Sequence, residues 1–215
     1  MLAASGILQG KRATISWWLK KEVLEQFPNV KWEPSRIIVR DGRIYTSGGA
    51  YSWLNLVIYL VEKYAGREMA IIISKLFGIQ IERDSQSPFM IFMPQKQHED
   101  ELILEAQAYI EKNYSERITV DELASRLAIS RRNLERRFKK MTFNSIVEYV
   151  QRVRIEAAKI VLEKGYENVN EAMYKAGYTD IKAFRTVFKK LTGLSPLEYR
   201  NKFSKTVALA ESEAI

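Results

Sequence analysis

The chain has 215 residues, of which 47% are hydrophobic and 28% are charged, and its formal net charge is +8 at pH 7. This composition is typical of a globular protein, and the length is sufficient for two modest domains. Because the chain contains no cysteine, disulfides, a thiolate nucleophile and cysteine-ligated metals are excluded, and we expect no metal site and no cofactor. Apolar runs are far shorter than the roughly 20 residues of a membrane span, and the first residues lack a secretory signal pattern. We therefore expect a cytoplasmic protein that makes no membrane contact.

Residues 1–95 are predicted to form a mixed α/β domain. Short strands are expected at 12–17, 36–40 and 43–46, with Asp41-Gly42 as the turn between the last two. Helices are expected at 18–27, where Pro28 ends the pattern, at 51–64, where Gly66 does so, and at 67–77. Residues 85–88 are predicted to form a loop.

The polar stretch 94–100 is predicted to separate this domain from an all-α domain at 100–203. Seven helices are expected there, at 100–114, 119–127, 131–141, 145–164, 169–176, 180–191 and 196–202. Residues 204–215 lack a core pattern and are predicted to form a flexible tail. The expected fold class is thus multi-domain, with an α/β part followed by a seven-helix part.

The second domain repeats itself at an offset of 50 residues. The segment 138–142 (FKKMT) recurs as 188–192 (FKKLT), Ser145 matches Ser195, and Tyr149 matches Tyr199. A duplicated supersecondary unit explains this pattern. The helix expected at 145–164 lies between the copies and would be roughly 30 Å long, close to the ~34 Å advance of one turn of B-DNA.

Each copy has the pattern of a helix-turn-helix unit, in which helical spacing places a basic ridge opposite the apolar stripe. Such a helix fits the major groove, where arginine pairs with guanine and asparagine with adenine. Base contacts are predicted for Arg131, Arg132, Asn133 and Arg136, and for Asp180, Ile181, Lys182 and Arg185. Phosphate contacts are predicted for Ser130, Arg137, Lys139, Lys140, Thr186, Lys189, Lys190 and Ser195. A basic stripe alone is more often a solvated face. The combination of two repeated stripes with a spacer of this length favours double-stranded DNA as the partner.

The second copy resembles the fingerprint of the AraC/XylS family of transcription regulators. The matching residues are Ala176-Gly177-Tyr178-Thr179-Asp180, Phe184, Phe188-Lys189-Lys190, Gly193, Ser195-Pro196 and Tyr199-Arg200, and in the first copy Leu123-Ala124, Ser130, Arg132, Leu134, Arg136, Phe138, Arg152, Arg154 and Ala157. The resemblance implies two helices that enter adjacent major grooves, RNA polymerase as a second partner, and activation as the usual outcome. Phe143 replaces a turn glycine of the family, which predicts an altered turn. Met173 replaces a small helix residue, and Thr186 replaces a frequent arginine, which predicts weaker base reading by the second copy.

The first half resembles the amidotransferase-like (PfpI-type) sensor domain found in one branch of this family. The supporting residues are 2–14, Trp17, Asp41-Gly42, Thr46-Ser47-Gly48-Gly49, Leu56 and Leu60-Val61-Glu62. The resemblance implies a partial domain, truncated at its N-terminus just after the nucleophile elbow of that fold. We therefore expect this half to sense a small-molecule effector or to form a homodimer.

Candidate ligand-binding residues in this half are Ser16, which stands where relatives often keep a histidine, and Tyr51 and Trp53, for which a core position is the alternative. The sole histidine, His98, is predicted to be a polar linker residue. The competing hypothesis, an amidotransferase-like hydrolase, lacks its nucleophile.

Overall fold

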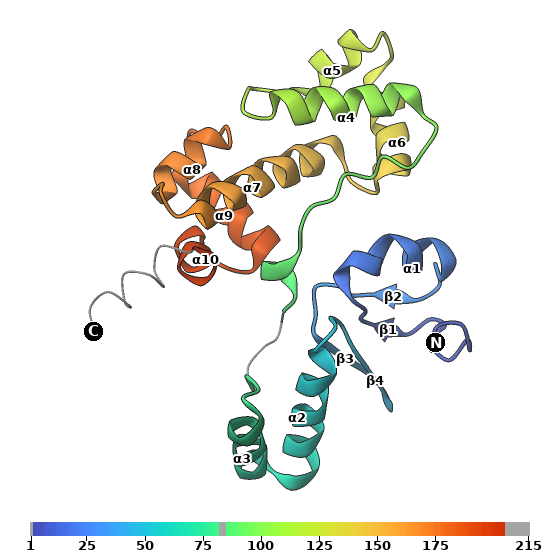
Figure 1. The fold of residues 1–215 in the computed structure, drawn as a ribbon. Coiled ribbons are helices and arrows are strands. Elements are labelled where there is room, and N and C mark those ends of the chain that lie inside the picture. The colour runs from blue at the N-terminus through green and yellow to red at the C-terminus, as the bar shows by residue number, and fades with distance from the viewer. Residues whose placement is uncertain (1, 82–84, 205–215) are drawn as a thin grey trace. The chain divides into compact units, whose positions relative to one another are not determined.

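The computed structural model describes residues 2–81 and 85–204 and contains two compact units, Met1–Met90 and Ile91–Ile215 (Figure 1). Of the predicted tail, only Ser204 is described, and it is buried; residues 205–215 lie outside the described residues. Within the described part, no helix is both long and apolar enough to cross a membrane.

The N-terminal unit combines two small sheets with helices. A parallel pair joins β1 (Arg12–Ala13) to β2 (Lys31–Trp32), and a hairpin joins β3 (Ile38–Asp41) to β4 (Ile44–Ser47). The helical elements are η1 (Trp17–Leu19), α1 (Lys20–Gln26), α2 (Ser52–Ala65), α3 (Arg67–Phe77) and η2 (Ser87–Phe89). The α/β character and both long helices agree with the sequence analysis.

Two sequence predictions for this unit are wrong in detail. The strand expected at 12–17 ends at Ala13, because the next backbone amide, Thr14 N, donates to the Thr46 hydroxyl (2.9 Å) and Trp17 begins a 3-10 turn. The strand β2 was not predicted. The loop expected at 85–88 overlaps the 3-10 turn η2, which extends to Phe89.

The buried amide of Gln86 ties the segments of this unit together. Its nitrogen lies 2.8–3.0 Å from the carbonyl oxygens of Ile15, Pro34 and Arg36, and its oxygen accepts from the backbone amide of Trp17 (3.3 Å). A buried amide whose hydrogen bonds are all satisfied stabilises the surrounding segments, but the loss of any partner would leave a buried polar group unpaired.

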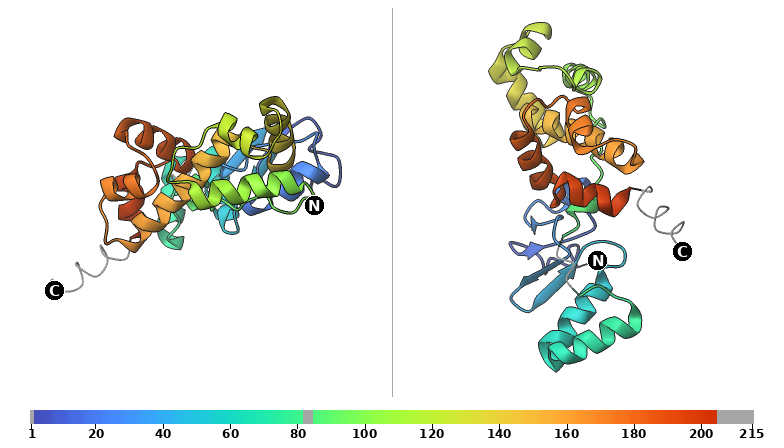
Figure 2. Two further views of the ribbon diagram at one scale, coloured as in Figure 1. Left: turned by 90° about the horizontal axis from the view of Figure 1, so that it is seen from above. Right: turned by 90° about the vertical axis from the view of Figure 1, so that its left-hand side faces the viewer.

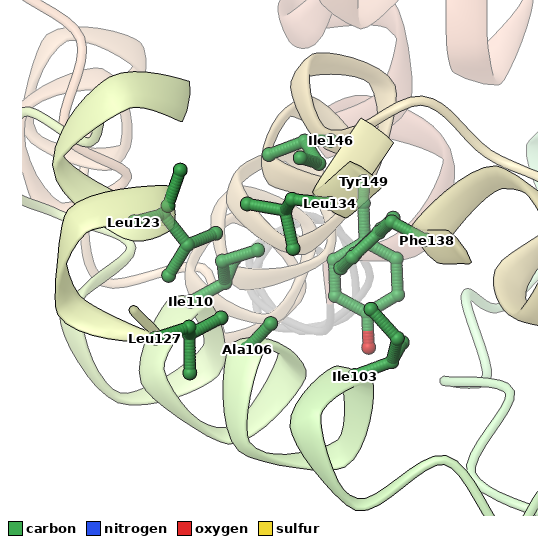
Figure 3. Packing of buried hydrophobic residues seen from close by; sticks show 10 residues of the cluster. Ile103, Ala106, Ile110, Leu123, Leu127, Leu134, Phe138, Ile146 and Tyr149 are labelled. Atoms are coloured by element: carbon green, nitrogen blue, oxygen red, sulfur yellow. The ribbon is translucent and has the colours of Figure 1, made fainter. Parts of the chain in front are cut away.

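The described part of the C-terminal unit is helical, with two repeats at opposite ends of one long helix (Figures 1 and 2). Its helices are α4 (Glu101–Asn113), α5 (Val120–Arg126), α6 (Arg131–Thr142), α7 (Ile146–Lys164), α8 (Val169–Lys175), α9 (Ile181–Thr192) and α10 (Pro196–Phe203). We call α5 and α6 the first repeat, and α8 and α9 the second repeat. Each repeat has its own apolar core; Figure 3 shows the core of the first.

Local signals explain why these helices begin where they do. Thr119, Ser145, Asn168 and Ser195 each form a capping box with the glutamate three residues on, and the side chains of Asp100, Ser130 and Asp180 also accept hydrogen bonds from first-turn amides. Such caps satisfy amides that would otherwise lack partners.

The two repeats also share their turns. Ala128 (φ 51°) and Gly177 (φ 78°) are left-handed at the bend between the helices, and Phe143 (φ 57°) and Gly193 (φ 78°) are left-handed after the second helix. The prediction of an altered turn at Phe143 is therefore wrong. Phenylalanine adopts the backbone conformation that favours glycine in the other copy.

Residues 91–100, which precede α4, form an ordered segment packed on the C-terminal unit, which we call the strap. The ring of Phe92 meets that of Tyr149 edge-on at 5.2 Å, and its backbone amide donates to Glu156 Oε2 (3.1 Å). Further along, Gln95 O accepts from Gln107 Nε2 (3.1 Å), and Lys96 pairs with Glu111 (2.6 Å).

Candidate nucleic-acid interface

The helix α6 carries cations on the side opposite its apolar stripe. Leu134 and Phe138 are fully buried in the first core, whereas Arg131, Arg132, Arg136, Lys139 and Lys140 are exposed. The hydroxyl of Ser130 accepts from Asn133 N (3.3 Å) and so caps this helix. The predicted basic ridge is therefore open to a partner.

Several of these cations already have weak partners. Arg131 lies 3.0 Å from Asp121 and 3.1 Å from Glu135, and Arg136 Nη2 donates to Asn133 Oδ1 (3.1 Å). Exposed pairs of this kind stabilise a fold little, so a phosphate or a base edge can displace them. Among the described residues, Arg132 and Lys140 have no hydrogen-bonding or ionic partner.

Arg137 differs from its neighbours because it is held within the fold. Its Nε and Nη2 donate to the two carboxylate oxygens of Asp100 at 2.9 and 2.6 Å, and the Asp100 side chain is only 7% exposed. The guanidinium holds the pKa of Asp100 below its usual range. A phosphate contact by Arg137 would require this clamp between α6 and the start of α4 to open.

The helix α9 presents a similar but sparser surface. Phe184 and Phe188 are buried, while Lys182, Arg185, Lys189 and Lys190 are exposed, and their side chains form no hydrogen bond or salt bridge with the described residues.

The other predicted residues of the second repeat are partly committed to the fold. Asp180 Oδ1 caps α9 by accepting from Lys182 N (2.6 Å) and Ala183 N (3.0 Å), and Ile181 is half-buried against the second core. The Thr186 hydroxyl donates to Lys182 O (2.8 Å), and Ser195 belongs to the capping box of α10.

The candidate ligand-binding residues of the N-terminal unit, Ser16, Tyr51 and Trp53, are not part of its buried core. Tyr51 and Trp53 are 77% and 56% exposed, so the core alternative for them is wrong. Ser16 Oγ accepts from Gly49 N (3.2 Å). No group of three or more histidine, aspartate or glutamate side chains suited to a metal ion occurs within residues 2–81 and 85–204.

Sequence reasoning missed two sets of contacts. The linker residue His98 is 3.0 Å from Gln107 Oε1 and accepts from Asp100 N (3.3 Å), so it takes part in ordering the strap. Arg154, quoted above only as a matching position, donates to two carbonyl oxygens of another segment. No signal in the sequence identifies either set of partners.

Two helical repeats, each with a cationic second helix and a buried phenylalanine at the matching position, define a helix-turn-helix DNA-binding protein. Residues 123–202 match a family model described as "Helix-turn-helix domain". The HTH-type transcriptional regulator GbdR of Pseudomonas aeruginosa is 28% identical over 203 residues, which cover 93% of this chain and 54% of the relative. An uncharacterized HTH-type transcriptional regulator of Pseudoalteromonas carrageenovora is 38% identical over 103 residues, which cover 48% of this chain and 61% of the relative.

Among solved structures, the DNA-binding domain of AdpA in complex with a target DNA is 29% identical and covers 47% of this chain and 91% of that domain, with a TM-score of 0.45. The chain spans 54% and 61% of the length of the two curated relatives named above. Residues 123–202 therefore form a helix-turn-helix domain, and the chain is similar to HTH-type transcription regulators along most of its length, in agreement with the resemblance to the AraC/XylS family.

Proposed function

We propose that this chain activates transcription by reading two adjacent major grooves, one with α6 and the other with α9. The observation that carries the proposal is the repetition of an exposed cationic helix at equivalent positions of the two repeats. The connecting helix α7 has 19 residues and is therefore about 28 Å long, which is close to the pitch of B-DNA.

In the first repeat, base reading falls to Arg131, Arg132, Asn133 and Arg136. Arg132 is the main reader, because it is exposed and has no partner to give up among the described residues. A guanidinium of this kind can pair in a fork with the two acceptors of guanine, and the Asn133 amide can pair with adenine. Arg131 must first leave Asp121 and Glu135, so it contributes less than Arg132.

In the second repeat, Lys182 and Arg185 are the exposed donors. The Asp180 carboxylate keeps Oδ2 available to accept from cytosine, since Oδ1 caps the helix, and Ile181 offers an apolar contact to a thymine methyl group. Most of the remaining predicted residues hold phosphates and set the register: Ser130, Lys139, Lys140, Thr186, Lys189, Lys190 and Ser195. Arg137 joins them only where its pair with Asp100 opens.

The test begins with a duplex enriched from a randomised library by the full chain. Arg132→Ala should weaken binding of this duplex by about 1–3 kcal/mol and relax selectivity at one base pair. Lys112→Ala is a matched control, because Lys112 is an exposed cation on α4, outside both repeats, and its loss should leave affinity within about twofold. Affinity should fall steeply with salt as counterions are released.

Binding that is weak, indifferent to sequence and equally affected by Arg132→Ala and Lys112→Ala would contradict the proposal. The sign of regulation has its own test, in which the enriched duplex is placed upstream of a promoter and transcripts are counted with purified RNA polymerase. An increase supports activation through the polymerase, and a decrease contradicts it.

For the N-terminal unit we propose an amidotransferase-like region, within residues 1–95, that senses a small molecule or joins two chains. The match to GbdR supports this, because it covers 93% of the chain and so extends through this unit. Ser16, Tyr51 and Trp53 are the proposed ligand contacts. Sedimentation of the full chain at micromolar concentration tests self-association, which a strict monomer would exclude.

A further inference from the structure

The two repeats are packed as separate bodies that share one helix. The first core contains Ile146 and Tyr149 from the start of α7, and the second contains Ile155, Ala158 and Leu162 from the rest of it. Within residues 85–204, no buried residue belongs to both cores. A single helix of this length can bend gently along its axis, so α7 alone would leave the angle between α6 and α9 loosely defined.

A second connection bypasses the helix axis. Arg154, which lies on α7 where the two cores meet, donates from Nε to Tyr114 O (2.7 Å) and from Nη2 to Glu116 O (2.7 Å). Both carbonyls belong to the loop that follows α4, in the first half of the unit. The same guanidinium lies over the ring of Tyr178, 5.3 Å from its centre, in the second half.

The backbones of the two halves also touch directly at this point. A Cβ atom added to Gly177 would lie 2.5 Å from Ser115 O and 2.7 Å from Ser115 Cα, and Gly177 is left-handed (φ +78°). Only glycine therefore allows the bend of the second repeat to approach the loop that Arg154 holds.

These contacts extend to both DNA-facing helices. On one side, the ring of Tyr178 packs against Phe184 of α9 at 5.4 Å. On the other, α4 shares the first core with Leu134 of α6, and Asp100 at its start is paired with Arg137. The angle between the two recognition helices is thus set through side chains and backbone as well as through α7.

We propose that Arg154 is a positioning residue that, with Ser115, Gly177 and Tyr178, forms a latch fixing the relative orientation of α6 and α9. The inference rests on the proposed reading of two grooves. The latch would then determine which spacing and helical phase two DNA segments must have for one chain to bind both of them. Arg154 itself touches neither segment.

A spin-label experiment tests the latch without DNA. Because the chain has no cysteine, Ala108→Cys on α4 and Tyr174→Cys on α8 give two unique labels at exposed positions of the full chain. We expect a narrow distance distribution in this parent, and a distribution at least twice as wide after Arg154→Ala or Arg154→Lys. Arg200→Ala is the matched control, since Arg200 Nη2 donates to Gly165 O (3.1 Å) within the second half alone.

A DNA experiment then separates a positioning role from a merely structural one. Inserting two base pairs between the segments of the enriched duplex turns one groove by roughly 70° relative to the other. The parent chain should lose at least 20-fold in affinity on insertion, whereas Arg154→Ala should lose no more than about threefold, because its second repeat can follow the displaced groove. Arg200→Ala should retain the penalty of the parent.

Equal distance distributions in the parent and both Arg154 variants, or an equal insertion penalty, would overturn the inference. If the parent chain enriches no duplex, the proposed two-groove function fails instead, and the label distances still decide whether Arg154 holds the two halves together. Failure of the latch and failure of the proposed function are therefore distinguishable.

Discussion

Replacing Ala128 with glycine should stabilise the C-terminal unit, although it removes a methyl group and creates no contact. Ala128 follows α5 as Gly177 follows α8, and the backbone hydrogen bonds of the two bends match. Ile129 N donates to Ala124 O (3.1 Å) as Tyr178 N donates to Met173 O (3.1 Å). Both bends are the left-handed helix ends at which glycine is usual.

The expected magnitude follows from the backbone. A left-handed conformation costs a residue with a Cβ atom about 1–2 kcal/mol, and glycine avoids this cost. Against this gain, glycine lowers the free energy of unfolding by about 0.5–1 kcal/mol, because its unfolded chain has more conformational freedom than that of alanine. Because Ala128 is exposed, its methyl group contributes little packing. The net gain is about 0.5–1 kcal/mol, or roughly 2–4 °C in Tm for a unit of this size.

Urea unfolding followed by far-ultraviolet circular dichroism measures this change. Ala108→Gly makes the same chemical change at an exposed position within α4, where it should cost about 1 kcal/mol. Gly177→Ala should also destabilise, and by more than the conformational cost, because its Cβ would meet Ser115. The reasoning is refuted if Ala128→Gly destabilises the unit as much as Ala108→Gly does.

Substitutions at three other positions test the packing described above. Tyr178→Phe should leave the free energy of unfolding unchanged or slightly higher, because the Tyr178 hydroxyl is buried and has no hydrogen-bond partner among the described residues. Tyr178→Ala, which removes the ring, should cost about 3–5 kcal/mol in the same urea titration. Arg137 lowers the pKa of Asp100, so the pair contributes stability above the ordinary carboxyl pKa, and this stability is lost as pH falls through the lowered pKa. The urea midpoint should therefore fall more steeply between about pH 5 and pH 3 in the parent chain than in Asp100→Asn. Gln86→Leu should cost the N-terminal unit at least about 2 kcal/mol in thermal unfolding, and an unchanged Tm would contradict the role of its amide.

Most of the C-terminal unit was predictable because its signals are local. Capping residues such as Thr119 and Ser145 lie within three residues of the groups they satisfy, so most predicted helix bounds fall within one or two residues of those observed. Helical periodicity likewise identified which cations of α6 face outward. The strand β2 escaped detection, because its two residues are defined only by pairing with β1, 19 positions earlier along the chain.

The same distinction separates the predictable from the unpredictable part of the candidate interface. The exposure of Arg132 follows from its place on the helix, but the capture of Arg137 by Asp100 joins residues 37 positions apart. Two arginines of the same helix can therefore differ in availability, because a partner distant in sequence holds one of them and not the other.

The strap ahead of α4 has a practical consequence for dissecting this regulator. A DNA-binding fragment cut at residue 100, where the composition changes, would lose the ring that covers Tyr149 and the carbonyl that accepts from Gln107. It would also leave Glu156 without the backbone amide of Phe92. A fragment intended to contain the whole C-terminal unit should therefore begin near residue 91. The polar segment expected to link the two domains is instead packed as part of the C-terminal unit.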